Sequence, residues 1–222
     1  MQFREVTILI IAETLLSLVL FAAVIGILVF LVRNSIRKYK PVDLAVFDRL
    51  QRWVSPANNR VMLFFSFLGS HKFLIPANLL LIFFFLFALH QNWFSIRVIT
   101  IALSSLSLMF LLKYLFQRKR PLSPLLKAAR GLSFPSGHAI ISVTFYGLLL
   151  HICWNLVETA WLRWGIAVLL TTIILLIGYS RIYLRVHYAS DVISGFIIGV
   201  LWLLISLWVL DNLEQYSRAT TQ

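Results

Sequence analysis

Three clusters of polar residues in an otherwise apolar sequence have the residue types needed to bind and transfer a phosphate group. They occupy residues 113–121, 135–138 and 180–191. Their cations include Lys113, Arg120 and Arg181. Guanidinium groups bind phosphate oxygens in a bidentate manner, and a lysine ammonium supplies a point charge. We therefore expect these three side chains to share one phosphate-binding site.

The second cluster, Pro-Ser-Gly-His at residues 135–138, precedes a predicted helix. Backbone N–H groups at a helix N-terminus lack intrahelical acceptors and bind anions, and glycine lets the backbone approach a ligand closely. Ser136 and Gly137 are therefore predicted to bind the phosphate through backbone donors.

The third cluster contains His187 and Asp191, four residues apart. Residues i and i+4 of a helix share a face, so the carboxylate can bond one imidazole nitrogen and leave the other free to attack phosphorus. His138 then remains for proton transfer to the leaving oxygen. The three cations would stabilise charge on the phosphoryl oxygens during transfer.

Six apolar segments are expected to position these clusters, because a helix of roughly 20 apolar residues crosses a bilayer. They are residues 8–32, 73–90, 98–116, 138–154, 164–180 and 188–210. The first cluster follows the third segment, the second cluster opens the fourth, and the third cluster joins the fifth to the sixth. Successive crossings alternate in direction, so all three clusters fall on one side of the membrane.

The segment between the first two spans has a different pattern. The apolar residues Val46, Phe47, Leu50, Trp53 and Val54 recur there at helical spacing. Charged and polar residues lie between them. This pattern is typical of an amphipathic helix lying in the membrane interface. Pro56 and Asn58-Asn59 are expected to break that helix. Residues 61–68 are too short to span, and their alternatives are a second interfacial or partly buried helix and a packed lid over the bundle. The predicted fold is thus an all-α integral membrane protein, a six-helix bundle with an interfacial helical segment between helices 1 and 2.

The composition agrees with a membrane protein. The chain is 60% hydrophobic and 13% charged, whereas soluble domains are about 25% charged. Its net charge is +12, but the basic residues lie between apolar segments, which disfavours nucleic acid as a partner and favours anionic lipid. With no polar linker to divide it, residues 1–222 are expected to form a single domain. We expect a monomer, and the sequence leaves an oligomer open.

The spacing K-x6-RP, PSGH and SR-x5-H-x3-D resembles the signature of the type 2 phosphatidic acid phosphatase superfamily at every position. The resemblance implies that His187 is the nucleophile of a phosphohistidine mechanism, that Asp191 orients it, and that His138 serves as acid and then as base. It also implies that Lys113, Arg120, Ser136, Gly137 and Arg181 hold the phosphate.

By the same resemblance, the substrate is a phospholipid or polyprenyl phosphate, such as phosphatidylglycerol phosphate, phosphatidic acid or undecaprenyl pyrophosphate. We expect no cofactor and no metal, because the predicted spans contain no carboxylate cluster and no His/Cys spacing typical of zinc. Three alternatives remain: a lipid phosphotransferase with the same site, a vanadium haloperoxidase, whose soluble nature disagrees with this composition, and a non-enzymatic anion transporter.

The distribution of basic residues conflicts with the sidedness that the resemblance implies. Of the 20 Lys and Arg residues, 16 fall on the side of the clusters. The other four are Arg4, Arg97, Arg163 and Arg218. The positive-inside rule would place the more basic side in the cytoplasm. The resemblance instead implies cytoplasmic termini in the inner membrane and a site on the periplasmic face, which we adopt as the prediction.

Overall fold

The computed structural model describes residues 30, 32–35, 38–122, 124–125 and 131–220. Residues 1–41 and 42–222 form two compact units, and the second unit contains all three polar clusters. Every regular element in the described ranges is helical. The first predicted span, 8–32, lies outside the described residues except for positions 30 and 32, so the six-helix count stays a prediction.

Five helices of the second unit are long and apolar enough to cross a membrane. They are α4 (His71–Phe83) continued by the π-helical turn η1 (Phe84–Ala88), α5 (Asn92–Phe116), α6 (Gly137–Leu156), α7 (Ala160–Tyr183) and α8 (Ala189–Thr220). Each coincides with one of the predicted spans from 73–90 onward. The last helix runs about ten residues beyond its predicted end.

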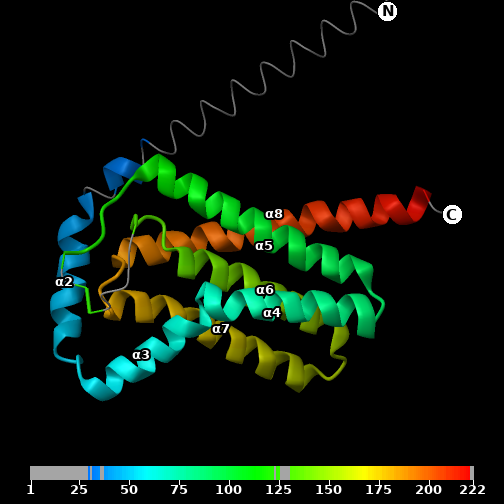
Figure 1. The fold of residues 1–222 in the computed structure, drawn as a ribbon, viewed down its shortest axis with the longest axis horizontal. Helices are drawn as coiled ribbons and strands as arrows, with labels where there is room; N and C mark the ends of the chain where they lie inside the picture. Colours follow the sequence, from blue (N-terminus) through cyan, green and yellow to red (C-terminus); the bar gives the residue numbers. More distant parts are fainter. Residues whose placement is uncertain (1–29, 31, 36–37, 123, 126–130, 221–222) are drawn as a thin grey trace, which may run out of the picture. The chain divides into compact units, whose positions relative to one another are not determined.

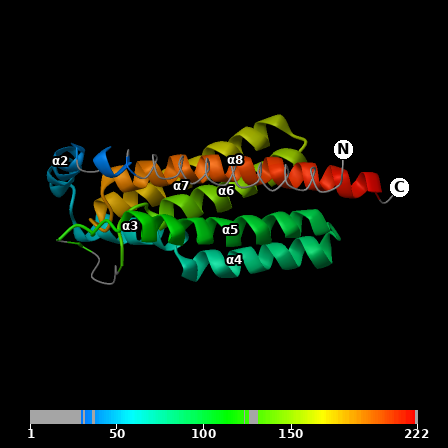
Figure 2. The same ribbon diagram turned by 90° about the horizontal axis from the view of Figure 1, so that it is seen from above.

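These five helices lie side by side, and α6 packs against α5, α7 and α8 (Figures 1 and 2). Buried apolar side chains join them, for example Ile101, Leu148 and Leu203 in one cluster and Phe145 with Ile177 in another. Large apolar side chains also cover the outside of the spans, as at Leu103, Phe110 and Trp208. Such an exterior suits contact with lipid. A helix is stable there because its backbone N–H and C=O groups are hydrogen-bonded within the helix.

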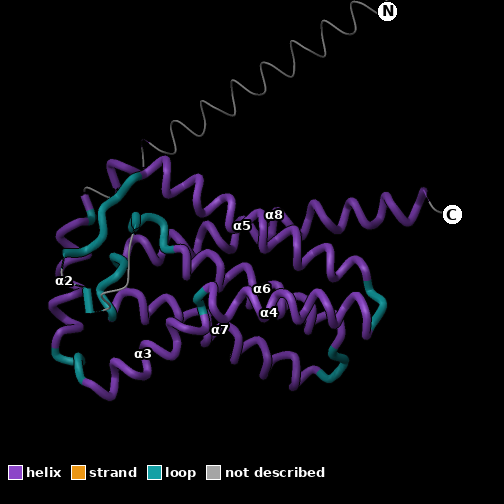
Figure 3. Tube along the Cα trace, in the orientation of Figure 1, coloured by secondary structure: helices purple, strands orange, loops and turns teal. Residues whose placement is uncertain are grey.

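Two shorter helices, α2 (Lys40–Gln51) and α3 (Pro56–Leu68), precede the spans and are joined by a short turn (Figure 3). The prediction that Pro56 and Asn58-Asn59 break the helix is only half right, because α2 ends at Gln51 but Pro56 begins α3, which contains both asparagines. The missing N–H of Pro56 costs nothing at the first helical position, and the Ser55 hydroxyl caps α3 by accepting from Asn58 N at 3.2 Å. On α2, the buried side chains are Asp43 and Phe47, whereas Trp53 lies beyond the helix and is largely exposed.

The chain reverses direction at each connection between α5 and α8. Consequently the end of α5, the start of α6, the end of α7 and the start of α8 all lie at one end of the bundle (Figure 1). The helices α2 and α3 lie at this same end. The fold therefore places all three polar clusters in one region.

Candidate functional site

Lys113 projects from the last turn of α5 and joins this helix to the segment that precedes α6. Its Nζ donates to Leu132 O at 2.9 Å and to Pro135 O at 3.0 Å. The charges of Arg120, Arg181 and Asp191 all act on the Lys113 ammonium. The first polar cluster is thus tied to the second by direct hydrogen bonds.

Arg120 lies in the loop after α5 and reaches the third cluster. Gln117 ends α5 in a left-handed conformation, with φ of 49°, a common way for a helix to stop. The Arg120 Nη1 donates to Val186 O at 2.9 Å, next to His187, and Nε donates to Gly131 O at 3.2 Å. Burial lowers the pKa of the Arg120 guanidinium, and the Asp191 carboxylate opposes this effect.

The second cluster begins α6, with Ser136 as its N-cap. The Ser136 N–H is already donated to Asp191 O at 3.0 Å, so anion binding falls to the next N–H groups of the first turn. A Cβ added at Gly137 would lie 2.4 Å from Met109 Sδ. Glycine there allows α5 to pack closely on the start of α6, a steric reason that differs from the predicted approach to an anion.

Arg181 lies in the last turn of α7 and is only 4% exposed. Its Nη1 donates to the hydroxyl of Ser66 on α3. Within the described residues, Arg181 Nε and Ser136 Oγ are buried polar atoms without a hydrogen-bond partner. Because buried polar groups normally have a partner, these two atoms are available to bind an anion.

His187 differs from its prediction in one respect. It lies in the turn between α7 and α8, because α8 begins only at Ala189, so the expectation that His187 and Asp191 share a helix face is wrong. Its Nδ1 is 3.7 Å from Asp191 Oδ2, beyond a hydrogen bond, and 3.5 Å from Ser133 Oγ. Burial, reinforced by the charges of Arg120 and Arg181, lowers the pKa of His187 to about 4, although Asp191 opposes this effect. The imidazole is therefore neutral near pH 7.

Asp191 is fully buried and accepts three hydrogen bonds through its carboxylate. The donors are Ser133 Oγ at 2.5 Å, Arg118 Nη1 at 2.6 Å and Tyr188 N at 2.9 Å. The bond from Tyr188 N resembles a capping box, in which an acidic side chain reaches back to cap its own helix. The carboxylate thus starts α8 and holds Ser133 beside His187.

Four residues of this region were not predicted: Asp43, Ser66, Arg118 and Ser133. Arg118 lies inside the first cluster and Ser133 lies two residues before the second, so proximity in sequence was an available signal for both. The contacts of Asp43 and Ser66 span more than 70 residues of sequence, and no motif marks them.

The assembled site combines three cations with two histidines and one buried carboxylate. The charges of Arg181 and Arg120 act both on His138, in the first turn of α6, and on His187, so the acid and nucleophile candidates lie among the cations. Across the described part of the chain, no three or more His, Cys, Asp or Glu residues group in a way that could hold a metal ion. Metal independence stays a prediction.

Comparison with known proteins adds a family match and one curated relative. The model of the PAP2 superfamily matches residues 94–215. Phosphatidylglycerophosphatase B of Bacillus subtilis (strain 168) is 29% identical over 148 residues, which are 66% of this chain and 72% of that protein.

Two solved structures are also similar. One is a transmembrane PAP2 type phosphatidylglycerolphosphate phosphatase from Bacillus subtilis, with a TM-score of 0.74 and 24% identity, covering 84% of this chain and 94% of that one. The other is LpxE of Aquifex aeolicus, with a TM-score of 0.57 and 29% identity, covering 74% of this chain and 93% of that one. The first likeness shows that the fold is a transmembrane PAP2 fold.

Proposed function

Since the chain belongs to the PAP2 superfamily, we propose that it is a membrane-embedded lipid phosphatase that uses a phosphohistidine intermediate. The observation that carries this proposal is the convergence of Lys113, Arg120 and Arg181 around two histidines at one end of the bundle. A phosphate held there lies beside a nucleophile and a proton donor, and the helices around it present apolar surface to lipid.

The proposed reaction begins with attack of His187 on phosphorus. Nδ1 faces Ser133 and Asp191, which leaves Nε2 to form the new P–N bond. The P–O bond to the lipid breaks in the same step, and His138 gives a proton to the leaving oxygen. Water then attacks the phosphohistidine, with His138 accepting its proton, and the P–N bond breaks to release orthophosphate and neutral His187.

Three features of the site support this mechanism. A neutral imidazole keeps the lone pair that nucleophilic attack requires, and burial keeps His187 neutral near pH 7. The cations Lys113, Arg120 and Arg181 are fixed in place by hydrogen bonds and can stabilise charge on the phosphoryl oxygens. Ser136 and Gly137 begin α6, whose N-terminal N–H groups add further donors.

The proposed substrate is a phospholipid or polyprenyl lipid with a phosphate monoester or pyrophosphate. Phosphatidylglycerol phosphate is the first candidate, because the curated relative is named a phosphatidylglycerophosphatase. Phosphatidic acid and undecaprenyl pyrophosphate present the same terminal group. Within this proposal, residues 1–222 work as one domain in the inner membrane, with the site facing the periplasm. A reporter that is active only in the periplasm should therefore stay silent when it is fused at the C-terminus.

The decisive experiment measures orthophosphate release from these three lipids by the full chain in detergent, with and without a chelator. We expect release from at least one lipid, no loss with chelator, and no activity for His187→Ala. The control is His151→Ala, which removes a histidine that contacts Asn155 in the last turns of α6 and should stay active. Inactivity of the wild type on every lipid contradicts the proposal. Formation of a phosphorylated lipid in place of free phosphate identifies a phosphotransferase instead.

A further inference from the structure

Arg118, two residues before the phosphate-binding Arg120, makes a different set of contacts. Its Nη1 donates to Asp191 Oδ1 at 2.6 Å and to Ser190 Oγ at 2.8 Å, and its Nη2 donates to Asp43 Oδ2 at 2.8 Å. The guanidinium also lies 4.0 Å from the centre of the Tyr188 ring. The group is therefore bound at both of its terminal nitrogens and stacked on one face.

Asp43 anchors the other side of this arrangement. It is 2% exposed on α2, and it also accepts from Ser190 N at 2.9 Å and from Ser190 Oγ at 2.7 Å. Asp43 thus holds Arg118 and the first turn of α8 together. A helix that comes before the five described spans thereby contacts the turn that carries His187.

Arg118 balances the charge of two buried carboxylates. Asp43 and Asp191 are both nearly inaccessible, and the side chain of Arg118 is 9% exposed. A buried carboxylate that loses its cation is strongly destabilised and tends to take up a proton or move. A displaced or protonated Asp191 could no longer hold the Ser133 hydroxyl beside His187.

We propose that Arg118 is a positioning residue for phosphoryl transfer, which fixes Asp191 beside His187 and is itself fixed by Asp43 of α2. This inference rests on the proposed function. Arg118 does not bind the phosphate, because its terminal nitrogens are used by Asp43, Ser190 and Asp191. It acts on the reaction through Asp191, whereas Arg120 acts on the phosphate.

The geometry requires arginine at this position. The guanidinium is planar, donates in fixed directions to two carboxylates, and stacks on an aromatic ring, whereas a lysine ammonium is a single point charge on a flexible stem. Arg118→Lys therefore keeps the charge and removes the bridge. This variant separates positioning from simple charge balance.

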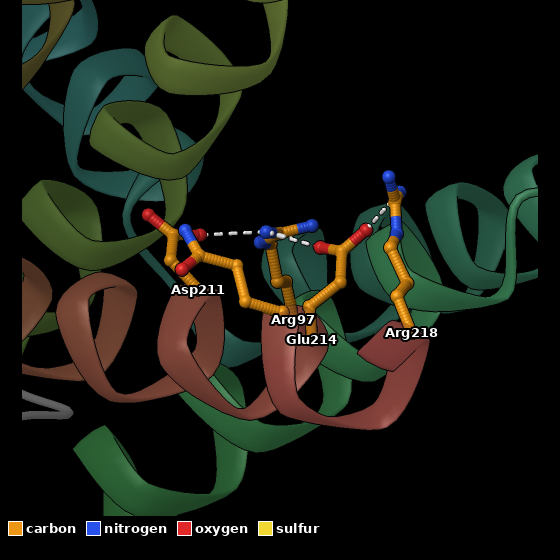
Figure 4. A pocket seen from close by; sticks show the side chains of 5 residues that line it. Arg97, Asp211, Glu214 and Arg218 are labelled. Carbon is orange, nitrogen blue, oxygen red and sulfur yellow. Dashed lines mark hydrogen bonds and ion pairs between the residues drawn. The ribbon is translucent and has the colours of Figure 1, made fainter. Parts of the chain in front are cut away.

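A matched control lies near the beginning of α5. Arg97 has a side chain with the same 9% exposure, and it donates to Asp211 at 2.6 Å and to Glu214 at 2.7 Å (Figure 4). It precedes Lys113 by 16 residues on one helix, which corresponds to about 24 Å. Arg97→Lys therefore disturbs another bridge from a buried arginine to two carboxylates, of which Asp211 is partly exposed, far from the phosphate site.

The test measures kcat, KM and inhibition by orthophosphate for the full chain in detergent, on the lipid that the wild type hydrolyses best. For Arg118→Lys we expect kcat to fall by about 100-fold, as for a small misplacement of a reacting group. KM and the inhibition constant should change by less than about threefold, because the phosphate-binding residues are untouched. Arg97→Lys should lower the apparent Tm without this selective loss of kcat.

A double-mutant cycle keeps the test valid if one variant folds poorly. Asp43→Asn should lower kcat less than Arg118→Lys, and it should add little further loss in the Arg118→Lys background, because both act through one contact. An unchanged kcat in folded Arg118→Lys, or fully additive effects, overturns the inference. A change confined to KM and phosphate inhibition also overturns it, since Arg118 would then bind phosphate. Wild-type inactivity on every lipid would contradict the proposed function itself, which is a separate outcome.

Discussion

His187 and Asp191 approach each other without a direct hydrogen bond, and the Ser133 hydroxyl is close to both. The distance between His187 Nδ1 and Asp191 Oδ2 is 3.7 Å. Ser133 Oγ donates to Asp191 Oδ2 at 2.5 Å and lies 3.5 Å from His187 Nδ1. The orientation of the proposed nucleophile therefore depends on a serine that lies just before the second polar cluster.

Removing this hydroxyl should impair the reaction more than substrate binding. A hydrogen bond to a charged group contributes about 1.5–3 kcal/mol, so Ser133→Ala is expected to lower kcat by about 10- to 100-fold with a smaller change in KM. The control is Ser142→Ala, because Ser142 is also fully buried but bonds Ala139 O of its own helix. Steady-state kinetics on the preferred lipid measure both. Equal effects of the two substitutions would show that Ser133 has no special role.

The neutral state of His187 should make the folded protein sensitive to acid. Burial lowers the pKa of His187 to about 4 in the folded chain, whereas an unfolded histidine titrates near 6.5. Between these two pKa values the unfolded chain binds a proton that the folded chain does not. The contribution of neutral His187 to the stability of the fold is therefore fully present above pH 6.5 and is lost as the pH falls through 4. The difference between the two pKa values corresponds to about 3 kcal/mol in the free energy of unfolding.

We expect the apparent Tm of the wild type to fall more steeply between pH 7 and pH 4.5 than that of His187→Gln. Thermal unfolding of both proteins in the same detergent measures this difference, and groups common to both cancel. Parallel curves would mean that His187 is accessible to protons in the folded state.

Ser66 should affect phosphate binding through Arg181. Its hydroxyl accepts from Arg181 Nη1 across the boundary between α3 and α7, and Arg181 is almost fully buried. Ser66→Ala is expected to weaken inhibition by orthophosphate by about tenfold, since a bond to a charged donor is lost. Ser105→Ala, which removes a fully buried hydroxyl bonded within α5, should leave inhibition unchanged. An unaltered inhibition constant in Ser66→Ala would contradict the role of α3 in the site.

The close contact between α6 and α8 should depend on Gly195. A Cβ added there would lie 2.8 Å from Ala139 Cβ, closer than real Cβ atoms pack, and 3.0 Å from Ser136 O. Small residues let helices approach in membranes, so Gly195→Ala should displace the start of α6 and reduce both activity and the apparent Tm.

Gly165→Ala is the matched control, because nothing lies within 4 Å of a Cβ at Gly165 on α7. Alanine favours helix over glycine by about 1 kcal/mol, so this variant should be as stable as the wild type or more so. If Gly195→Ala behaves in the same way, the two helices have room to adjust.

The positions of the spans from residue 73 onward could be predicted from sequence because length and hydropathy alone determine what crosses a bilayer. The alternation of crossings then placed the three polar clusters at one end. The helix boundaries were less predictable at Pro56, since the same residue can end one helix or begin the next.

The connections within the site were harder to predict. Sequence spacing put His187 and Asp191 on one helix, but α8 begins after His187 and the chain turns through a left-handed Arg185. Asp43 is one of two acidic residues on α2, nothing in the local sequence distinguishes it from Asp48, and its partner Arg118 is 75 residues away. A contact across that distance depends on the packing of the whole bundle, which no local pattern records.

The positions of Asp43 and Ser66 have a consequence for anyone who divides this protein into modules. Both lie outside residues 94–215, the stretch matched by the family model, while their partners Arg118 and Arg181 lie inside it. A chimera that transplants only this stretch would carry every signature residue, yet its Arg118 would lack Asp43 and its Arg181 would lack Ser66. Exchange of catalytic segments between relatives should therefore include α2 and α3 in the graft.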